Sequence, residues 1–205
     1  MTTIFSDVAS FNRACGVALR DEPGWPSDEE LALALRLISE EVDELRGALE
    51  ARDMIATADG IADVLYVTAG LALRVGVARQ LEGETSVLRD VIFSPSWDTY
   101  DREAPNSWPR RFDLYRNRLA AAVDDRNLRL TTAYLDVLIS ATAALGALLH
   151  LPMKSVWEAV QTSNLAKLVD GKVIRRDDGK IIKPDGWQPP DIAGALGSYG
   201  WKTAA

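Results

Sequence analysis

Three closely spaced glutamates are the first candidates for a chemical function. Glu40, Glu41 and Glu44 form a Glu-Glu-x-x-Glu pattern within a segment of helical periodicity. On a helical wheel that turns about 100° per residue, with Ile38 as the reference, they lie about 160°, 60° and 120° away on one side. The three carboxylates therefore cover one arc beside an apolar seam. Glutamate clusters on helices are usually solvated, so this pattern alone does not establish a site.

Two aspartates follow on a segment that is otherwise strongly apolar. Asp59 and Asp63 share a helical face with Tyr66 and Gly70, and they are the only formal charges within residues 54–73. Burying ionised carboxylates among apolar side chains is costly unless a cation or hydrogen-bond donors compensate. Facing helices would bring up to five carboxylates together, and such hard oxygen ligands suit Mg²⁺ or Mn²⁺. The two segments together predict a divalent-cation site.

Two helices must position these acids. Ser27 and Glu30 fit a capping box that opens the first helix, and the acidic first turn suits the positive end of a helix. Its apolar residues alternate spacings of four and three, which predicts packing against another helix: Leu31, Leu35, Ile38, Val42, Leu45 and Leu49. The second helix, from about Met54 to Val75, is apolar on almost every side and should be buried.

The rest of the chain also reads as mostly helical. We expect a short helix over 3–15, a loop-rich stretch over 76–109, and helices over 112–124 and 130–149. Pro152 fits the first turn of a further helix. After Lys167 the composition changes to Gly, Lys, Asp and Pro, and Asp-Gly pairs at 170–171 and 178–179 favour a small hairpin or an ordered tail.

Composition limits the function classes. The 205 residues are 47% hydrophobic and 26% charged, with 23 Lys and Arg against 30 Asp and Glu, a formal net charge of −7. An acidic protein is a poor candidate for binding nucleic acid or an anionic membrane. Cys15 is the only cysteine, which excludes an internal disulfide framework. The N-terminus lacks the pattern of a secretory signal, and the apolar run 137–149 is shorter than the roughly 20 residues of a membrane span. We expect a cytoplasmic protein.

Ordered motifs carry a family resemblance. Residues 37–45 (LISEEVDEL) and 58–67 (ADGIADVLYV), followed by Ser163-Asn-Leu-Ala-Lys167 and the Asp-Gly-Lys turns up to Asp191, resemble the all-α nucleoside triphosphate pyrophosphohydrolases of the MazG-like superfamily. The similarity is greatest to the phosphoribosyl-ATP pyrophosphohydrolase-like and MazG-like dUTPase branch. It covers about residues 3–77 and 150–196. It implies an all-α fold with a four-helix core, in which the middle of this chain is an insertion or a degenerate second repeat.

The resemblance also implies an activity: Mg²⁺-dependent hydrolysis of a nucleoside triphosphate between its α- and β-phosphates, giving a monophosphate and pyrophosphate. Mn²⁺ is a possible substitute metal. Carried over by motif, Glu41, Glu44 and Asp63 would bind the metal, and Glu40 would hold or deprotonate the attacking water together with Glu41 as catalytic residues. The first Glu of the family's second motif falls on Gly60, for which Asp59 is the expected substitute.

Substrate contacts are expected from the later residues. Asn164 and Lys167 would meet phosphate oxygens by resemblance, and we add as candidates Tyr66, Lys180, Lys183 and Trp187. The lysines of the tail are equally consistent with a solvated segment. Trp97, Tyr100 and Trp108 could stack on a base, although core packing is the commoner role of such residues. His150 beside Leu151-Pro152 fits a helix end better than a ligand.

The middle of the chain offers a possible second repeat. Residues 122–138 echo residues 48–65 with one gap, which would pair Asp136 with Asp63 and place residues 116–122 where the glutamate motif would stand. We therefore divide the single all-α domain into metal-binding helices (1–78), a loop-rich insertion (79–111), a possible degenerate repeat (112–150), and a phosphate-contacting helix and tail (151–205). The repeat predicts an intrachain pseudo-dimer, and its absence a homodimer.

The sequence is consistent with three classes of function. The first is a pyrophosphohydrolase acting on a nucleotide, and no serine-hydrolase elbow, P-loop or dinucleotide-binding motif competes with it. The second is a non-catalytic nucleotide or metal sensor, motivated by Gly60. The third is a helical scaffold whose acidic arc is only a hydrated face. The base of the nucleotide is left open among dUTP, dCTP, phosphoribosyl-ATP and damaged nucleotides.

Overall fold

The computed structural model describes residues 3–83, 87–91, 93–102, 107–177 and 179–202. Over these residues the chain is all-α, as predicted: it has nine helices and no strand. They are α1 (Ile4–Ala14), α2 (Asp28–Ala51), α3 (Met54–Arg74), α4 (Ala78–Leu81), α5 (Asp98–Arg102), α6 (Ser107–Asp124), α7 (Leu128–Leu148), α8 (Met153–Leu165) and α9 (Ile192–Gly197).

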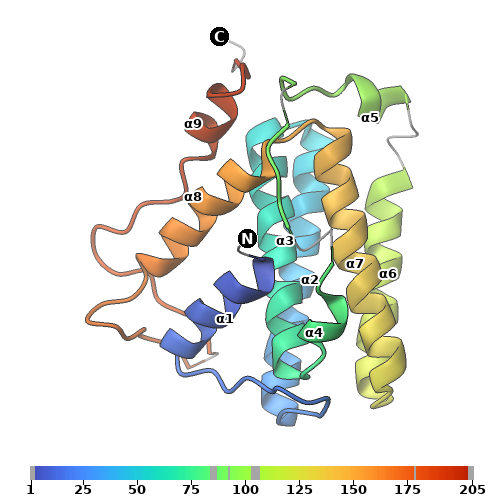
Figure 1. Cartoon of the computed structure of the whole chain (residues 1–205), viewed down its shortest axis with the longest axis vertical. Coiled ribbons are helices and arrows are strands. Elements are labelled where there is room, and N and C mark those ends of the chain that lie inside the picture. The colour runs from blue at the N-terminus through green and yellow to red at the C-terminus, as the bar shows by residue number, and fades with distance from the viewer. Residues whose placement is uncertain (1–2, 84–86, 92, 103–106, 178, 203–205) are drawn as a thin grey trace.

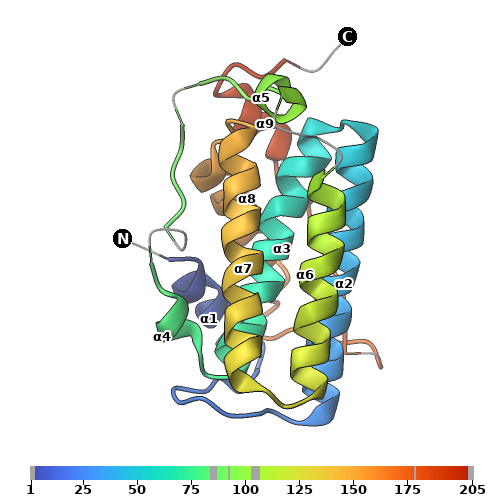
Figure 2. The same ribbon diagram turned by 90° about the vertical axis from the view of Figure 1, so that its right-hand side faces the viewer.

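Four long helices form the core of the molecule. Figure 2 shows α2, α3, α6 and α7 running side by side as a bundle, in which α2 pairs with α3 and α6 pairs with α7. The central helix is α3, which packs against α7 as well as α2. On its remaining side α3 is covered by α1 and α8 (Figure 1). A helix surrounded in this way must be apolar on nearly every side, which explains its sequence.

Local signals fix where the helices begin. Both halves of a capping box form at Thr3 before α1 and at Ser27 before α2, where Ser27 and Glu30 bond each other's backbone N–H groups at 3.2 Å. Asp53 caps α3 by accepting from the N–H groups of residues 55 and 56. The predicted apolar seam of α2 is buried, except that Leu35 is only half-buried.

The α3 and α7 helices are each long and apolar enough to cross a membrane by length and composition. Core helices of water-soluble bundles share that composition. The most apolar window is 72% buried inside the bundle for α3 and 39% buried for α7.

A structural repeat relates the two helix pairs. The bounds of α7 lie 74 residues after those of α3 at both ends, at 128 against 54 and at 148 against 74. The connections repeat too: Arg52 and Arg126 both adopt left-handed φ, of 54° and 51°, and an Asx residue then caps the next helix. Gly76 and His150 occupy equivalent left-handed positions after the two helices. His150 is therefore a helix-end residue, as expected.

This register corrects the gapped alignment made from the sequence. The residue of α7 equivalent to Asp63 is Val137, not Asp136, because α3 and α7 match without a gap. Counting 74 residues along α6 places Tyr115 and Arg118 at the positions of Glu41 and Glu44. The second copy thus carries no carboxylate at any of these positions. The buried threonines do repeat, as the pairs Thr57/Thr131 and Thr68/Thr142.

The remaining differences concern residues 76–109 and the C-terminal segment. The stretch predicted as loop contains α4, α5 and the first turn of α6, so Trp108 is a buried helical residue. After α8 the described part of the tail has isolated bridges at Val169–Lys172 and Arg175–Ile181, followed by α9. The predicted turn at 178–179 includes Asp178, which lies outside the described residues.

Candidate metal and phosphate site

A cavity of about 700 Å³ lies between α1, α2, α3, α8 and the tail. Ten of the eleven residues proposed from the sequence line it: Glu41, Glu44, Asp59, Asp63, Tyr66, Asn164, Lys167, Lys180, Lys183 and Trp187. They come from segments up to 146 residues apart in the chain, from Glu41 on α2 to Trp187 in the tail. The structure therefore brings the acids of α2 and α3 together with the lysines that follow α8.

The four carboxylates in this cavity disfavour one another's charge. Burial raises the pKa of Glu41 to about 7, and repulsion from Glu44, Glu40 and Asp59 adds to this effect, while Lys180 opposes it. Burial also raises the pKa of Asp63 well above its ordinary value, with a further contribution from Glu41. A site with this much mutually repelling negative charge would be stabilised by a cation.

The donor set fits a hard divalent ion in its chemistry. All four side chains offer oxygen ligands, and Asp59 Oδ1 is buried without a hydrogen-bond partner among the described residues. Across the described ranges, however, no three His, Cys, Asp or Glu side chains are already grouped as a metal ion would require. Glu41, Glu44, Asp59 and Asp63 could hold the ion only after their carboxylates turn toward a common point.

Glu40 is placed differently from the other predicted acids. Its carboxylate does not line the cavity but forms ion pairs with Lys180 Nζ at 2.5 Å and with Arg36 Nε at 4.0 Å. Glu40 therefore ties the tail to the rim of the site. The role expected for it, holding the attacking water, would require Lys180 to release it.

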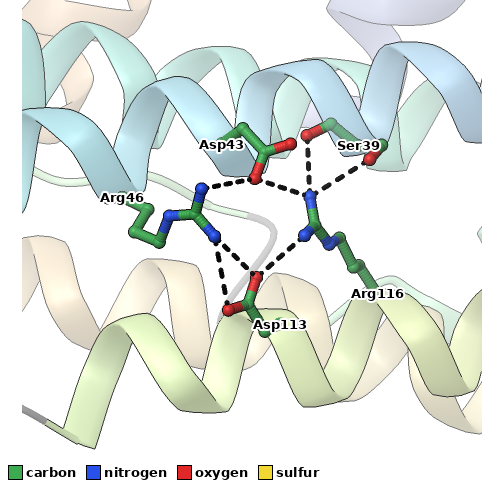
Figure 3. A network of polar contacts seen from close by, with 5 residues as sticks. All are labelled: Ser39, Asp43, Arg46, Asp113 and Arg116. Atoms are coloured by element: carbon green, nitrogen blue, oxygen red, sulfur yellow. Dashed lines mark hydrogen bonds and ion pairs between the residues drawn. The ribbon is translucent and has the colours of Figure 1, made fainter.

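Asp43, inside the same acidic motif, belongs to the bundle instead. Figure 3 shows it facing α6, where its carboxylate pairs with Arg116 at 2.8 Å and with Arg46 at 3.1 Å. Arg116 also pairs with Asp113 at 3.0 Å and donates to the backbone oxygen and hydroxyl of Ser39. This network clamps α2 to α6 on the side away from the cavity. It assigns the acids of α2 to two faces: Asp43 to the bundle, Glu41 and Glu44 to the cavity.

The lysines of the cavity all come from the segment that follows α8. Lys167 Nζ donates to Asn164 Oδ1 at 2.6 Å, and burial lowers the pKa of Lys167. Trp187 is held by its indole N–H, which donates to the backbone oxygen of Ser163 at 2.9 Å. Lys183 Nζ lies 4.1 Å from the centre of the Trp187 ring, and Lys167 Nζ lies 5.7 Å from it. The two ammonium groups thus flank one aromatic ring at the wall of the cavity.

Tyr66 lies further along the cavity. Its hydroxyl donates to Gln161 Oε1 at 2.9 Å, and its ring packs between Phe11 and Trp157, with centroid distances of 5.8 and 5.3 Å. Trp97, Tyr100 and Trp108 do not line this cavity. Instead Trp97 stacks edge-on with Tyr100 beneath Arg52, which makes these aromatics packing residues.

Sequence reasoning missed the part of the cavity formed by α1 and the end of α3. Asn12, Cys15, Arg74 and Arg175 line it. Asn12 lies on the same amphipathic helix as Val8 and Phe11, and nothing in its spacing separates it from a core polar residue. A possible signal was Arg74, because a charge at the end of so apolar a helix needs a polar partner or a ligand.

Comparisons with known proteins gave one family match. Residues 8–84 match the family described as phosphoribosyl-ATP pyrophosphohydrolase, and this segment includes α2, α3 and all four cavity carboxylates. The match covers less than half of the chain. No curated protein and no solved structure matches.

Proposed function

Residues 8–84 match the phosphoribosyl-ATP pyrophosphohydrolase family. From this premise we propose that the protein is a MazG-like all-α enzyme that hydrolyses a nucleoside triphosphate between its α- and β-phosphates. The family indicates a pyrophosphohydrolase of nucleotide-like substrates. The finer assignment, an NTP or dNTP as substrate and Mg²⁺ as cofactor, is our proposal. The observation that carries it is one cavity in which four carboxylates face Asn164 and Lys167.

The residues suggest how the charges are divided. Glu41, Glu44, Asp59 and Asp63 would hold Mg²⁺, which when bound supplies charge neutralisation and polarises the phosphate oxygens. Asn164, near the end of α8, and Lys167, two residues after the end of that helix, line the same cavity and would contact the phosphates directly. Phosphoanhydride hydrolysis depends mainly on such positioned charges and on an aligned water.

The hydrolytic step requires a base near the substrate. A water oxygen forms a bond to the α-phosphorus, while the bond between this phosphorus and the oxygen that bridges to the β-phosphate breaks. Pyrophosphate is the leaving group. The proton of the water passes to a carboxylate. Glu41 is the better candidate because it lines the cavity, whereas Glu40 is paired with Lys180 at its rim. If Glu41 takes the proton, Glu44, Asp59 and Asp63 remain to hold the metal.

We further propose that the chain forms an intrachain pseudo-dimer. The α6–α7 pair stands against α2–α3 and repeats the α3 register through α7. It lacks acids at the positions equivalent to the cavity carboxylates, so one chain would provide one active site. Light scattering coupled to size-exclusion chromatography should give the mass of one chain. A homodimer as the active species would contradict this part of the proposal.

The activity is tested by pyrophosphate release. The full chain is incubated with the common ribo- and deoxyribonucleoside triphosphates, phosphoribosyl-ATP and inorganic tripolyphosphate, with Mg²⁺ or with EDTA. We expect Mg²⁺-dependent release of pyrophosphate from at least one nucleotide, and none from Asp63→Asn. Nucleotide binding without hydrolysis would support a sensor instead. The absence of both nucleotide binding and a thermal shift with Mg²⁺ or Mn²⁺ would support a scaffold.

A further inference from the structure

The cavity extends well beyond the carboxylates, toward α1 and the C-terminal end of α3. Gly70 and Arg74 line this inner end from α3, and Phe11 and Asn12 line it from α1. Gly70 lies seven residues after Asp63, which is about 10 Å along the helix axis. A nucleotide whose phosphates lie at Asp63 would therefore direct its sugar and base toward this end. The residues of this inner end take no part in the proposed hydrolytic step.

Asn12 presents an unsatisfied donor there. Its side chain is 8% exposed, and its Nδ2 is buried without a hydrogen-bond partner in the part of the chain that the structure describes. Its backbone oxygen already accepts from the N–H of Val17 at 2.9 Å, which anchors the residue at the end of α1. Leaving a buried N–H unpaired costs free energy, so such a group usually has a partner or a ligand.

Gly70 packs directly against this amide. It has no side chain, and a Cβ atom built on it would lie 3.7 Å from Asn12 Nδ2 and 3.9 Å from Val8 Cγ1. Any larger side chain at position 70 would extend into the space beside the amide. The glycine therefore lets α1 and α3 approach closely enough to bring the Asn12 amide to this end of the cavity.

Arg74 supplies a second donor, one helical turn after Gly70. It is 9% exposed, and its Nε is buried with no hydrogen-bond partner within the described ranges. A guanidinium group can only donate, so a ligand that meets it must present an acceptor. Both unsatisfied atoms at this end of the cavity are N–H donors, whereas the unsatisfied atom at the other end is Asp59 Oδ1. The two ends thus differ in the chemistry that they lack.

The walls between these polar groups suit a flat ring. Phe11 and Tyr66 contact each other edge to face at 5.8 Å, and both line the cavity with Val8 and Leu37. An apolar slot with a few fixed donors is the usual form of a pocket for a heterocycle.

On this geometry, and resting on the proposed function, we propose that the inner end of the cavity is the nucleobase site, where Asn12 and Arg74 donate to carbonyl oxygens of the base. The base would then be a keto base, such as uracil, thymine or guanine. Adenine has no carbonyl oxygen, and its acceptors N1 and N7 each lie beside the amino group, which is itself a donor, so adenine would match two N–H donors less well. The enzyme would therefore select its substrate at Asn12 and Arg74, far from the carboxylates that act on the phosphates.

The test compares nucleotides with a substrate that has no base. We would measure kcat/KM of the full chain for dUTP, dTTP, dGTP, dATP and deoxyribose 5′-triphosphate. The wild type should prefer a keto nucleotide to dATP by roughly tenfold or more, as expected when a buried donor is left unpaired. Asn12→Asp should lose most of that preference. Its kcat/KM for deoxyribose 5′-triphosphate should stay within about twofold of the wild-type value, because this substrate has no base to contact residue 12.

Two further variants keep the test independent of folding. Asn117→Asp, on an exposed part of α6, is the matched control and should change nothing. Gly70→Val fills the space beside the amide without altering Asn12, and it should lower kcat/KM for nucleotides but spare the base-free substrate. Melting temperatures would show that the variants are folded.

The failure of this inference is separable from that of the proposed function. Hydrolysis with base preference unchanged in folded Asn12→Asp and Gly70→Val would overturn the base site and leave the activity standing. A wild type that hydrolyses nothing would overturn the activity. In that case binding of α,β-methylene dUTP, measured by calorimetry, tests the base site alone: loss of binding in Asn12→Asp supports it, and unchanged or absent binding contradicts it.

Discussion

A Cβ atom on Gly60 would lie 3.1 Å from Leu45 Cα and 3.2 Å from Leu45 Cβ. The backbones of α2 and α3 therefore approach each other closely at Gly60, between the turns that carry Asp59 and Asp63. A glutamate at position 60 could not reach the cavity, because its side chain would point into the backbone of α2. Asp59, one residue earlier, lines the cavity instead.

Enlarging Gly60 should destabilise the protein because the atom it would meet is backbone. We expect Gly60→Val to lower the free energy of unfolding by about 1–3 kcal/mol, the usual cost of overpacking a core. Gly47 is the control, since a Cβ there meets nothing within 4 Å and Gly47→Ala should gain up to about 1 kcal/mol of helix propensity. Urea denaturation measures both. Equal stability of Gly60→Val and the wild type would show that the helices can separate without cost.

The carboxylates that line the cavity should be essential for hydrolysis. Glu44→Gln and Asp63→Asn each remove one charge with little change of size, and we expect each to abolish pyrophosphate release. Without metal their stability should hold or rise, because repulsion within the cavity falls. Glu50→Gln, on the exposed face of α2, is the control. Most of the activity remaining in either folded variant would contradict the assignment of the site.

Asp59 should act as the substitute for the missing glutamate. Its Oδ1 is buried without a hydrogen-bond partner over the described ranges, and burial together with Glu44 raises its pKa. We expect Asp59→Asn to shift the Mg²⁺ titration of activity to markedly higher concentrations. Superimposable titration curves for the variant and the wild type would show that Asp59 is only a buried polar residue.

The acidic cavity should make the metal-free protein less stable as pH rises. Glu41 has an ordinary pKa of 4.5 that is raised to about 7 in the fold. Between these values the folded protein holds a proton that the unfolded chain has released, so the free energy of unfolding falls as pH rises from about 4.5 to 7. Melting temperatures in EDTA should show this decline, and Glu41→Gln should reduce it. A Tm that stays level over this range in the wild type would argue against the raised pKa.

The sequence predicts the bundle and the acidic site because both depend on helical periodicity. Ser27, the seam of α2 and the apolar length of α3 determine where those helices lie, and two acids four residues apart on α3 must share a face. The different contacts that the acids of the glutamate motif make cannot be predicted from helical periodicity. Glu40 and Asp43 differ from Glu41 and Glu44 only through partners far along the chain, Lys180 and Arg116.

The inner end of the cavity was hidden for the same reason. Asn12 becomes a candidate only when α1 lies against Gly70, and nothing local to either residue predicts that contact. The repeat could be detected from the sequence, but its register could not. The features that the second copy repeats are the positive φ at Arg126 and the helix cap at Asn127, rather than matching acids.

The tail must be tested by point substitution rather than by truncation. Cutting the chain after Leu168 would also remove α9, whose Ile192 and Leu196 are buried against α8 and α3. Such a truncation would damage the bundle and could not isolate the role of the tail at the cavity. Single changes at the cations avoid this problem.

Lys167 should contribute directly to catalysis. Its ammonium group is partly buried, bonded to Asn164 at 2.6 Å and placed across the cavity from Asp63, so it is positioned before any substrate arrives. We expect Lys167→Ala to lose about 3 kcal/mol of transition-state stabilisation, a fall of roughly a hundredfold in kcat, as for other positioned charges. Lys183→Ala, on the exposed tail beside Trp187, should instead raise KM several-fold with a smaller effect on kcat. Exposed Lys154→Ala on α8 is the control. Unchanged kcat and KM in folded Lys167→Ala would show that the cation does not contact the substrate.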